Sequence, residues 1–264
     1  MTNANSVLTE KALAETYDGG YYENSWEIVQ QYRDATRYAS KHDVGSAATA
    51  SALKLPRSRL RTWIDDGGKP DPVRGIEIAH DYGWLECSYG DPVFAGLNTL
   101  VANVFSGGSI AVQYYQPSFA LNHREGDSHV FDAFELAGIE YEVVDDRGDH
   151  GDEVRPAEHS TVLGRTLAAL GAPVGPKSDQ HLDLPPYLDG APEAVRETFV
   201  YAYLENRAIE HDEKQTLTIR EDRNRTYLSA LADLINDVAR GGVSLQERDI
   251  VISADASRSL GTVR

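Results

Sequence analysis

Apolar residues recur at helical spacing in several separate stretches of the chain. The segment 25–43, SWEIVQQYRDATRYASKHD, has the spacing of an amphipathic helix. A second helix is expected over 127–137 and a third over 223–240. Gly138 and Gly241 follow these two helices, where glycine commonly ends a helix.

β-Patterned runs lie between these helices. The runs 109–121 and 214–221 are expected to form strands, and in the second run Leu217 and Ile219 alternate with polar residues. Further strands are expected at 139–144 and 249–253. Each half of the region 91–264 then has the order helix, strands, helix, strands, which indicates a duplicated unit of the α+β class.

Two apolar helices begin 100 residues apart, LVANVFSGG (Leu100 to Gly108) and VYAYLENRA (Val200 to Ala208). Each resembles the nine-residue motif of the LAGLIDADG homing endonucleases, and the passage between them, VLGRTLAALGAPVGPKSDQHLDLPPYL, resembles that family's connection between repeats. The resemblance covers residues 92–264. It implies a duplicated LAGLIDADG-type α/β-saddle domain over 91–264, with repeats at about 91–175 and 185–264.

In that family the eighth motif position is an acid that binds a divalent metal. Gly107 and Arg207 occupy it here, so the resemblance implies vestigial metal positions, no catalytic residues and no metal or other cofactor. Cleavage by two metal ions needs carboxylates that hold the ions about 4 Å apart, and Glu205 is the one acid in either motif. We therefore expect a protein that is not an enzyme. An active or nicking homing endonuclease of a mobile element is the alternative.

Residues 25–90 have a different character and resemble a helix-turn-helix module. An alanine-rich helix over 46–53 precedes a tight connection at 54–56, and a second helix starts at Pro56 or Arg57 and ends before Gly67. In such modules the second helix lies in the major groove. Leu60, Trp63 and Ile64 are expected to pack inward. The expected DNA-binding residues are Lys54, Arg57, Ser58, Arg59, Arg61 and Thr62.

Charge separates this module from the rest of the chain. The protein has a formal net charge of −17. Residues 25–85 carry nine Lys and Arg against eight Asp and Glu, whereas residues 86–264 carry fifteen against thirty. The four basic residues within 54–61 have no acid among them, which favours a double-stranded DNA partner over the plainer interpretation of a solvated arginine face. Only six of the 25 basic residues are lysine, which suggests adaptation to molar salt and a haloarchaeal source.

These features together predict a cytoplasmic, sequence-specific DNA-binding transcription regulator with a catalytically inactive second domain. That domain either keeps a DNA contact or serves as a scaffold for a protein partner or small ligand, and its excess of acids favours the scaffold. A scaffold without any DNA role is a further alternative, and a homodimer is left open. The candidate saddle contacts are Gln113, Tyr115, Lys214, Thr216, Thr218 and Arg220.

The remaining composition bears on disulfides, metal sites and membrane contact. Cys87 is the single cysteine, so no internal disulfide or multi-cysteine metal site forms. We expect no signal peptide and no membrane contact, because no apolar stretch approaches the ~20 residues needed to cross a bilayer. The eight histidines form no metal-binding pattern. Residues 1–24 form either a flexible arm or a short extra helix.

Overall fold

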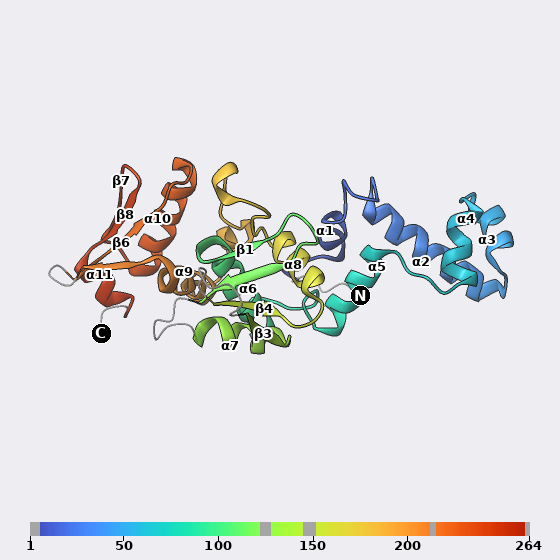
Figure 1. The fold of residues 1–264 in the computed structure, drawn as a ribbon, viewed down its shortest axis with the longest axis horizontal. Coiled ribbons are helices and arrows are strands. Elements are labelled where there is room, and N and C mark those ends of the chain that lie inside the picture. Colours follow the sequence, from blue (N-terminus) through green and yellow to red (C-terminus); the bar gives the residue numbers. More distant parts are fainter. Residues whose placement is uncertain (1–5, 122–127, 145–151, 212–214, 262–264) are drawn as a thin grey trace.

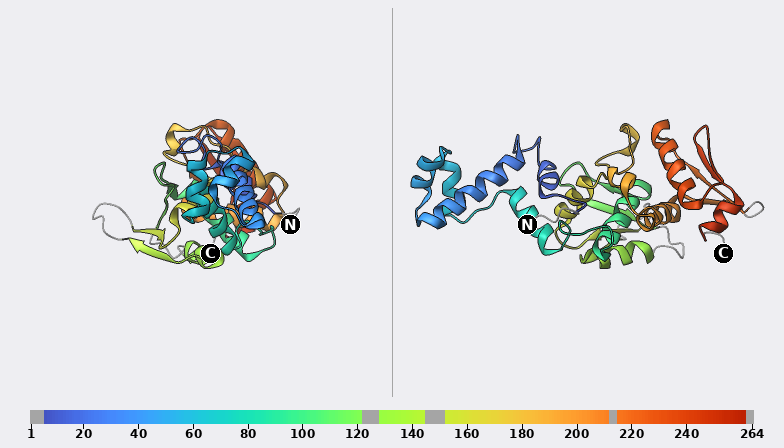
Figure 2. Two further views of the ribbon diagram at one scale, coloured as in Figure 1. Left: turned by 90° about the vertical axis from the view of Figure 1, so that its right-hand side faces the viewer. Right: turned by 180° about the vertical axis from the view of Figure 1, so that it is seen from behind.

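The computed structural model describes residues 6–121, 128–144, 152–211 and 215–261. The molecule is elongated (Figure 1), with a small group of helices at one end and a β-sheet with its helices at the other. The two further views in Figure 2 show the same elongation, and the slender end is built from the N-terminal part of the chain. Among the described residues, no helix combines the length and the apolar character that crossing a membrane requires.

The slender end, called the tip below, is carried by one long helix. α2 (Ser25–His42) runs outward from the bulk of the molecule and holds α3 (Ser46–Leu53), α4 (Arg57–Leu60) and the π-helical turn η1 (Arg61–Asp65) at its far end. α2 begins with Asn24 as its N-cap, whose side chain accepts a hydrogen bond from the Glu27 backbone N–H. Ala35, Leu60 and Trp63 form a separate small core here. The tip therefore packs on its own apolar contacts.

The junction between the tip and the rest of the molecule contains α1 (Glu10–Glu15) and α5 (Asp71–Asp81). Leu13 and Ala14 of α1 are fully buried, and Val29 near the start of α2 belongs to the same large core. The Ser6 hydroxyl donates a hydrogen bond to the Leu85 carbonyl, 2.5 Å away. The described part of the N-terminal segment is thus packed against the molecule, and of the two alternatives for residues 1–24 the short extra helix is present.

The body consists of two antiparallel four-stranded sheets with the same strand order, β1-β2-β4-β3 and β5-β6-β8-β7. Each sheet follows one long helix, and those two helices, α6 and α9, pack against each other. Helices α7 and α8 accompany the first sheet, and α10 and α11 accompany the second. The body elements are α6 (Pro92–Ser106), β1 (Gly108–Ile110), β2 (Pro117–Ala120), α7 (Ser128–Ala137), β3 (Tyr141–Val144), β4 (Glu153–Pro156), α8 (Ser160–Ala169), the 3-10 turns η2 (Lys177–Asp179) and η3 (Pro186–Gly190), α9 (Glu193–Arg207), β5 (Ile209–His211), β6 (Thr216–Arg220), α10 (Arg225–Ala239), β7 (Val243–Gln246), β8 (Asp249–Ile252) and α11 (Ala254–Ser259).

The alternation of side chains in the strands explains the packing of both sheets. In β6, Leu217 and Ile219 are buried, whereas Arg220 is exposed. Phe119 of β2 is paired in register with Val154 of β4, and both are buried. Buried side chains of both sheets thus join the main core.

The structure confirms the α+β class. The expected strand 109–121 is wrong in detail, because β1 and β2 are two short strands joined by a turn over 111–116. Strands β4, β5 and β7 were not expected individually. The repeated order of elements is an observation on this chain, whereas the finer LAGLIDADG-type saddle is not confirmed by it. The helix-turn-helix interpretation and the domain boundaries stay predictions.

Candidate functional site

The tip places a short connection between two helices at its outer end. Lys54 ends α3 in the left-handed conformation, with φ 55°, and Pro56 precedes α4. The helix that α4 begins continues as the π-turn η1, in which the Asp66 N–H reaches the Arg61 carbonyl at 3.1 Å. π-Turns widen a helix locally and occur frequently at functional sites. The chain thus forms a compact helical pair followed by a widened turn.

The α4–η1 segment has one buried and one exposed face. Leu60 and Trp63 are buried, and Ile64 is partly buried and packs with them. The six residues expected to contact DNA are all exposed: Lys54, Arg57, Ser58, Arg59, Arg61 and Thr62. All six residues are therefore open to solvent, and together they are called the reading face below.

Two contacts hold the reading face in place. The Arg59 Nη1 atom donates a hydrogen bond to Gln31 Oε1 of α2 at 2.6 Å, and the guanidinium lies 5.9 Å from the centre of the Trp63 ring. The Asp65 carboxylate accepts hydrogen bonds from the Ser46 N–H at 3.1 Å and from its hydroxyl at 2.6 Å. These hydrogen bonds lower the pKa of Asp65 and satisfy the start of α3, whose own N-cap is Gly45.

The remaining cations of the reading face are available to a partner. Among the described residues, the side chains of Lys54, Arg57 and Arg61 make no hydrogen bond or ion pair. Arg57 and Arg61 are four residues apart, so they lie about one helical turn from each other. A groove of about 900 Å³ lies between α2 and the 68–70 segment, and Ser58, Arg59 and Thr62 of the reading face line it. The reading face thus has two guanidiniums without a partner among the described residues, and a third, that of Arg59, which lines the groove.

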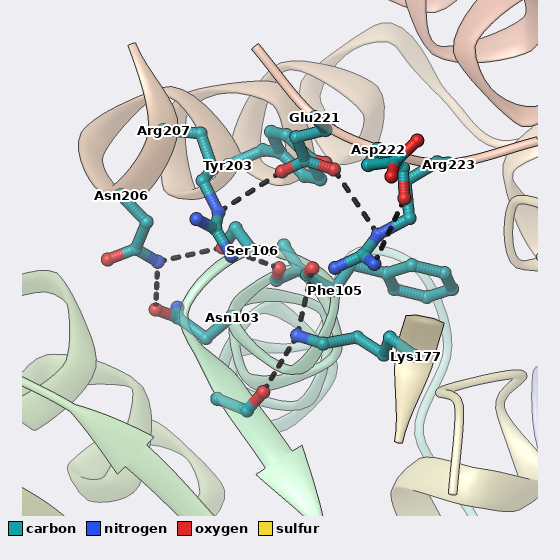
Figure 3. Close-up of polar contacts among 12 residues, drawn as sticks. Asn103, Phe105, Ser106, Lys177, Tyr203, Asn206, Arg207, Glu221, Asp222 and Arg223 are labelled. Carbon is teal, nitrogen blue, oxygen red and sulfur yellow. Dashed lines mark hydrogen bonds and ion pairs between the residues drawn. The ribbon is translucent and has the colours of Figure 1, made fainter. Parts of the chain in front are cut away.

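A second polar cluster lies where the two central helices end (Figure 3). The Asn206 amide of α9 donates hydrogen bonds to Asn103 Oδ1 at 2.7 Å and to Ser106 Oγ at 2.8 Å, both on α6. A Cβ atom on Gly107 would lie 3.1 Å from the Asn206 side chain. The absence of a side chain at position 107 therefore allows the two helix ends to approach closely.

Arg207 is held by a buried acid in this cluster. Its Nε atom lies 3.1 Å from Glu221, whose side chain is only 3% exposed, and Arg223 lies 3.6 Å from the other oxygen of the same carboxylate. The Lys177 ammonium donates hydrogen bonds to the carbonyls of Val104, Phe105 and Gly108 at 2.7–3.1 Å, at the end of α6. Burial and the like charges of both arginines lower the pKa of Lys177 to about 8. Arg207 thus pairs with an acid of the same chain, although its side chain stays 38% exposed.

The residues at the former motif positions do not fit a metal site. Gly107 offers no side-chain ligand, and Arg207 is a cation. The nearby carboxylate of Glu221 is already shared by two guanidiniums. Among the described residues, no group of three or more His, Cys, Asp or Glu side chains could hold a metal ion. The donor set of this cluster suits ion pairing within the chain.

The expected saddle contacts do not form one basic surface. Arg220 pairs with Asp249 at 2.8 Å, and Thr216 and Thr218 are half-buried neighbours on the same strand. Gln113 and Tyr115 lie in the turn 111–116, where Tyr115 packs against Arg165, and Lys214 lies outside the described residues.

The sequence reasoning missed two groups at the junction. Glu10 of α1 accepts two hydrogen bonds from Arg33 of α2, both 2.8 Å, and contacts His80 Nε2 of α5 at 2.9 Å. In the second group the Arg165 guanidinium lies between the rings of Tyr17 and Tyr115, at 3.8 and 3.9 Å. Both groups join residues far apart in the chain, so no local pattern indicates them.

Comparisons with known proteins place this chain in no family. No family model matches it, and no curated protein matches it. Its structure is similar to the crystal structure of full-length DUF199/WhiA from Thermatoga maritima, with a TM-score of 0.44 and 10% sequence identity. The match covers 69% of this chain and 59% of the other protein. The chain thus spans less than two thirds of that structure.

The expected membership of the LAGLIDADG family is corrected by these comparisons. No family model supports it, and the similar solved structure is described as DUF199/WhiA. The physical reason lies in the features that carried the resemblance, which are small and apolar residues along two helices. Any pair of closely packed helices needs such residues, and α6 and α9 are such a pair. The haloarchaeal source, which the shortage of lysine suggested, is not supported by these comparisons either.

Proposed function

We propose that this protein is a sequence-specific DNA-binding regulator of transcription that reads double-stranded DNA with the reading face of α4–η1. The supporting observation is the geometry of the tip. Its exposed cations are presented by a helix whose opposite face is anchored by Leu60 and Trp63. A helix held in this way can enter the major groove as a rigid unit.

The side chains of the reading face suit base and phosphate contacts. An arginine guanidinium spans the two acceptors of guanine in the major groove, and this is the commonest specific contact. Arg57 and Arg61 have no acid partner among the described residues, so both are available for such contacts. Arg59 is positioned by Gln31 and suits a phosphate contact at the groove edge.

The body serves, in this proposal, as a scaffold without nuclease chemistry. Its excess of acids repels DNA phosphates, and the exposed cation Arg220 is neutralised by Asp249. Gly107 and Arg207 supply no metal ligand, and Glu221 is engaged by two arginines. DNA is therefore expected to meet the molecule at the tip.

Binding-site selection from random duplexes tests the proposal. The full chain should enrich a defined sequence, and R57A and R61A should each weaken binding to it about 5- to 150-fold, which corresponds to about 1–3 kcal/mol. K54A should weaken specific and nonspecific binding alike and reduce the salt slope by about 0.9. R37A is the matched control, because Arg37 is an exposed arginine on α2 that pairs with Asp34.

Enrichment of no sequence, or equal losses for R37A and R61A, would contradict the proposed DNA contact. The proposed lack of nuclease activity is tested separately with supercoiled plasmid and Mg²⁺ or Mn²⁺. The proposal expects no nicks above the level of a heat-inactivated sample. Nicking by the full chain above that level would instead identify a nuclease.

A further inference from the structure

A pocket of about 660 Å³ lies where the N-terminal segment meets the body. One side is formed by residues 16–20 and by α5, and the other by the turn 111–116 and by α8. Figure 1 shows α1 and α8 next to each other in this part of the molecule, and the two helices are in contact. The pocket contains no residue of the reading face, and it includes the group of Arg165, Tyr17 and Tyr115 described above.

Arg165 is the unusual residue of this pocket. Its guanidinium is stacked between the Tyr17 and Tyr115 rings, and its Nη1 atom donates a hydrogen bond to the Thr16 carbonyl. Its buried Nε atom has no hydrogen-bond partner among the described residues, and no described acid forms an ion pair with the guanidinium. A half-buried arginine without a carboxylate is conspicuous in a chain that carries 42 acids.

The acids of the pocket are already engaged. Asp18 Oδ1 accepts a hydrogen bond from the Ser25 N–H at 2.6 Å, and Asp71 forms an ion pair with Arg74. Neither carboxylate forms an ion pair with Arg165. Burial lowers the pKa of the Arg165 guanidinium, and the charge of Asp71 opposes this only in part. An incoming carboxylate is therefore the group that would complete its electrostatic environment.

Two large exposed side chains line the pocket. Tyr114 and Val112 are 65% and 66% exposed. Clustered large apolar side chains in water mark binding sites more often than isolated ones do. The entrance therefore favours a ligand with a flat apolar part.

The backbone of the turn is strained in a way that shapes this entrance. Tyr114 and Tyr115 both have positive φ, 65° and 52°, although neither is glycine. Positive φ is uncommon for residues other than glycine and persists where the surrounding structure holds it. Gly164 of α8 permits this path of the turn, since a Cβ at that position would clash with the Tyr115 carbonyl oxygen. The turn therefore packs closely on α8, and both tyrosines line the pocket.

We propose that this pocket binds a small aromatic carboxylate. The carboxylate pairs with Arg165, and the aromatic ring packs on Tyr114 and Val112 at the entrance. Phosphate alone would pair with the guanidinium without packing on the apolar side chains at the entrance. A neutral aromatic molecule would pack on those side chains without pairing with the guanidinium. The proposal is independent of DNA binding, because it is measured on the protein alone.

Titration calorimetry and ligand-detected NMR with indole-3-acetate and 4-hydroxyphenylacetate test the proposal on the full chain. At least one of them should bind saturably, and about tenfold or more tightly than its amide, which corresponds to about 1.4 kcal/mol. R165K should reduce that preference, because lysine keeps the charge but loses the planar fork that pairs with both oxygens of a carboxylate. Y114A should weaken binding several-fold.

Y201A is the matched control, since Tyr201 is an exposed tyrosine on α9 away from the pocket, and it should bind like the unmodified protein. The far-ultraviolet spectrum and thermal midpoint of each variant check that it is folded. If neither carboxylate binds saturably below about 10 mM, the proposal is overturned. Equal binding of acid and amide, binding of inorganic phosphate alone, or binding that neither R165K nor Y114A changes would also overturn it.

Discussion

The substitution E221Q should destabilise the body strongly, because it removes the one carboxylate that two arginines share. Glu221 is 3% exposed, and its oxygens lie 3.1 Å from Arg207 Nε and 3.6 Å from Arg223 Nε. Glutamine has nearly the same shape, so the change alters charge far more than packing. The result would be two guanidiniums facing a neutral amide.

The size of the effect follows from the burial of the three groups. At an effective dielectric constant of about 20, each contact contributes roughly 5 kcal/mol of Coulomb attraction, and much of this is offset by the cost of removing the charges from water. Breaking a buried pair by removing one partner costs about 3–5 kcal/mol. The Arg207 side chain is 38% exposed and recovers some hydration. We therefore expect a loss of about 3 kcal/mol in the free energy of unfolding.

Urea unfolding followed by circular dichroism measures this loss. For a slope of about 3 kcal/mol/M, the midpoint should fall by about 1 M. E193Q is the matched control, since Glu193 forms an exposed pair with Arg240, and it should change the free energy of unfolding by less than about 0.5 kcal/mol. A loss below about 1 kcal/mol for E221Q, or equal losses for the two variants, would show that the buried cluster is not held by charge.

Three further substitutions test other parts of the structure. E10Q should lower the free energy of unfolding at neutral pH, because the hydrogen bonds from Arg33 lower the pKa of Glu10 from 4.5 to about 2. That stabilisation is present above pH 4.5 and lost as the pH falls toward 2, so urea midpoints of E10Q should vary less with pH in this window than those of the unmodified protein. G164A should cost about 1–3 kcal/mol in thermal unfolding, since its methyl group would meet the Tyr115 carbonyl oxygen 1.8 Å away. W63A should cost about 3–5 kcal/mol within the tip, so that hydrogen exchange accelerates there while the body keeps its protection.

The helices were largely predictable because each presents a periodic apolar face to a core. α3 occupies the residues expected for it. Lys54, in the left-handed conformation, ends α3, and Pro56 immediately precedes α4. The inward and outward residues of the reading face followed from the same periodicity. The π-turn of η1 was not predictable, since it depends on how Trp63 packs against α2.

The polar clusters could not be predicted, because their members meet only through the fold. Arg207 precedes β5 and Glu221 follows β6, so the two meet only when these strands pair. Tyr17 and Arg165 are 148 positions apart in the chain. Single charged residues at those positions resemble ordinary surface charges in the sequence. A positional pattern carries information about neighbours one helical turn or one strand step away, and these contacts lie beyond that range.

The junction pocket and the reading face are connected by one continuous helix. Asp18, which lines the pocket, accepts a hydrogen bond from the first residue of α2, Ser25, and the same helix holds Arg59 through Gln31. Glu10 and Arg33 attach α2 to α1 beside this point. A helix is stiff over the length of α2, so a small change at its base alters the direction in which the tip points. An occupant of the pocket that moves residues 16–20 would therefore reorient the reading face relative to the body without contacting the reading face. The size of this reorientation is limited by how much more tightly the occupant binds one orientation than the other.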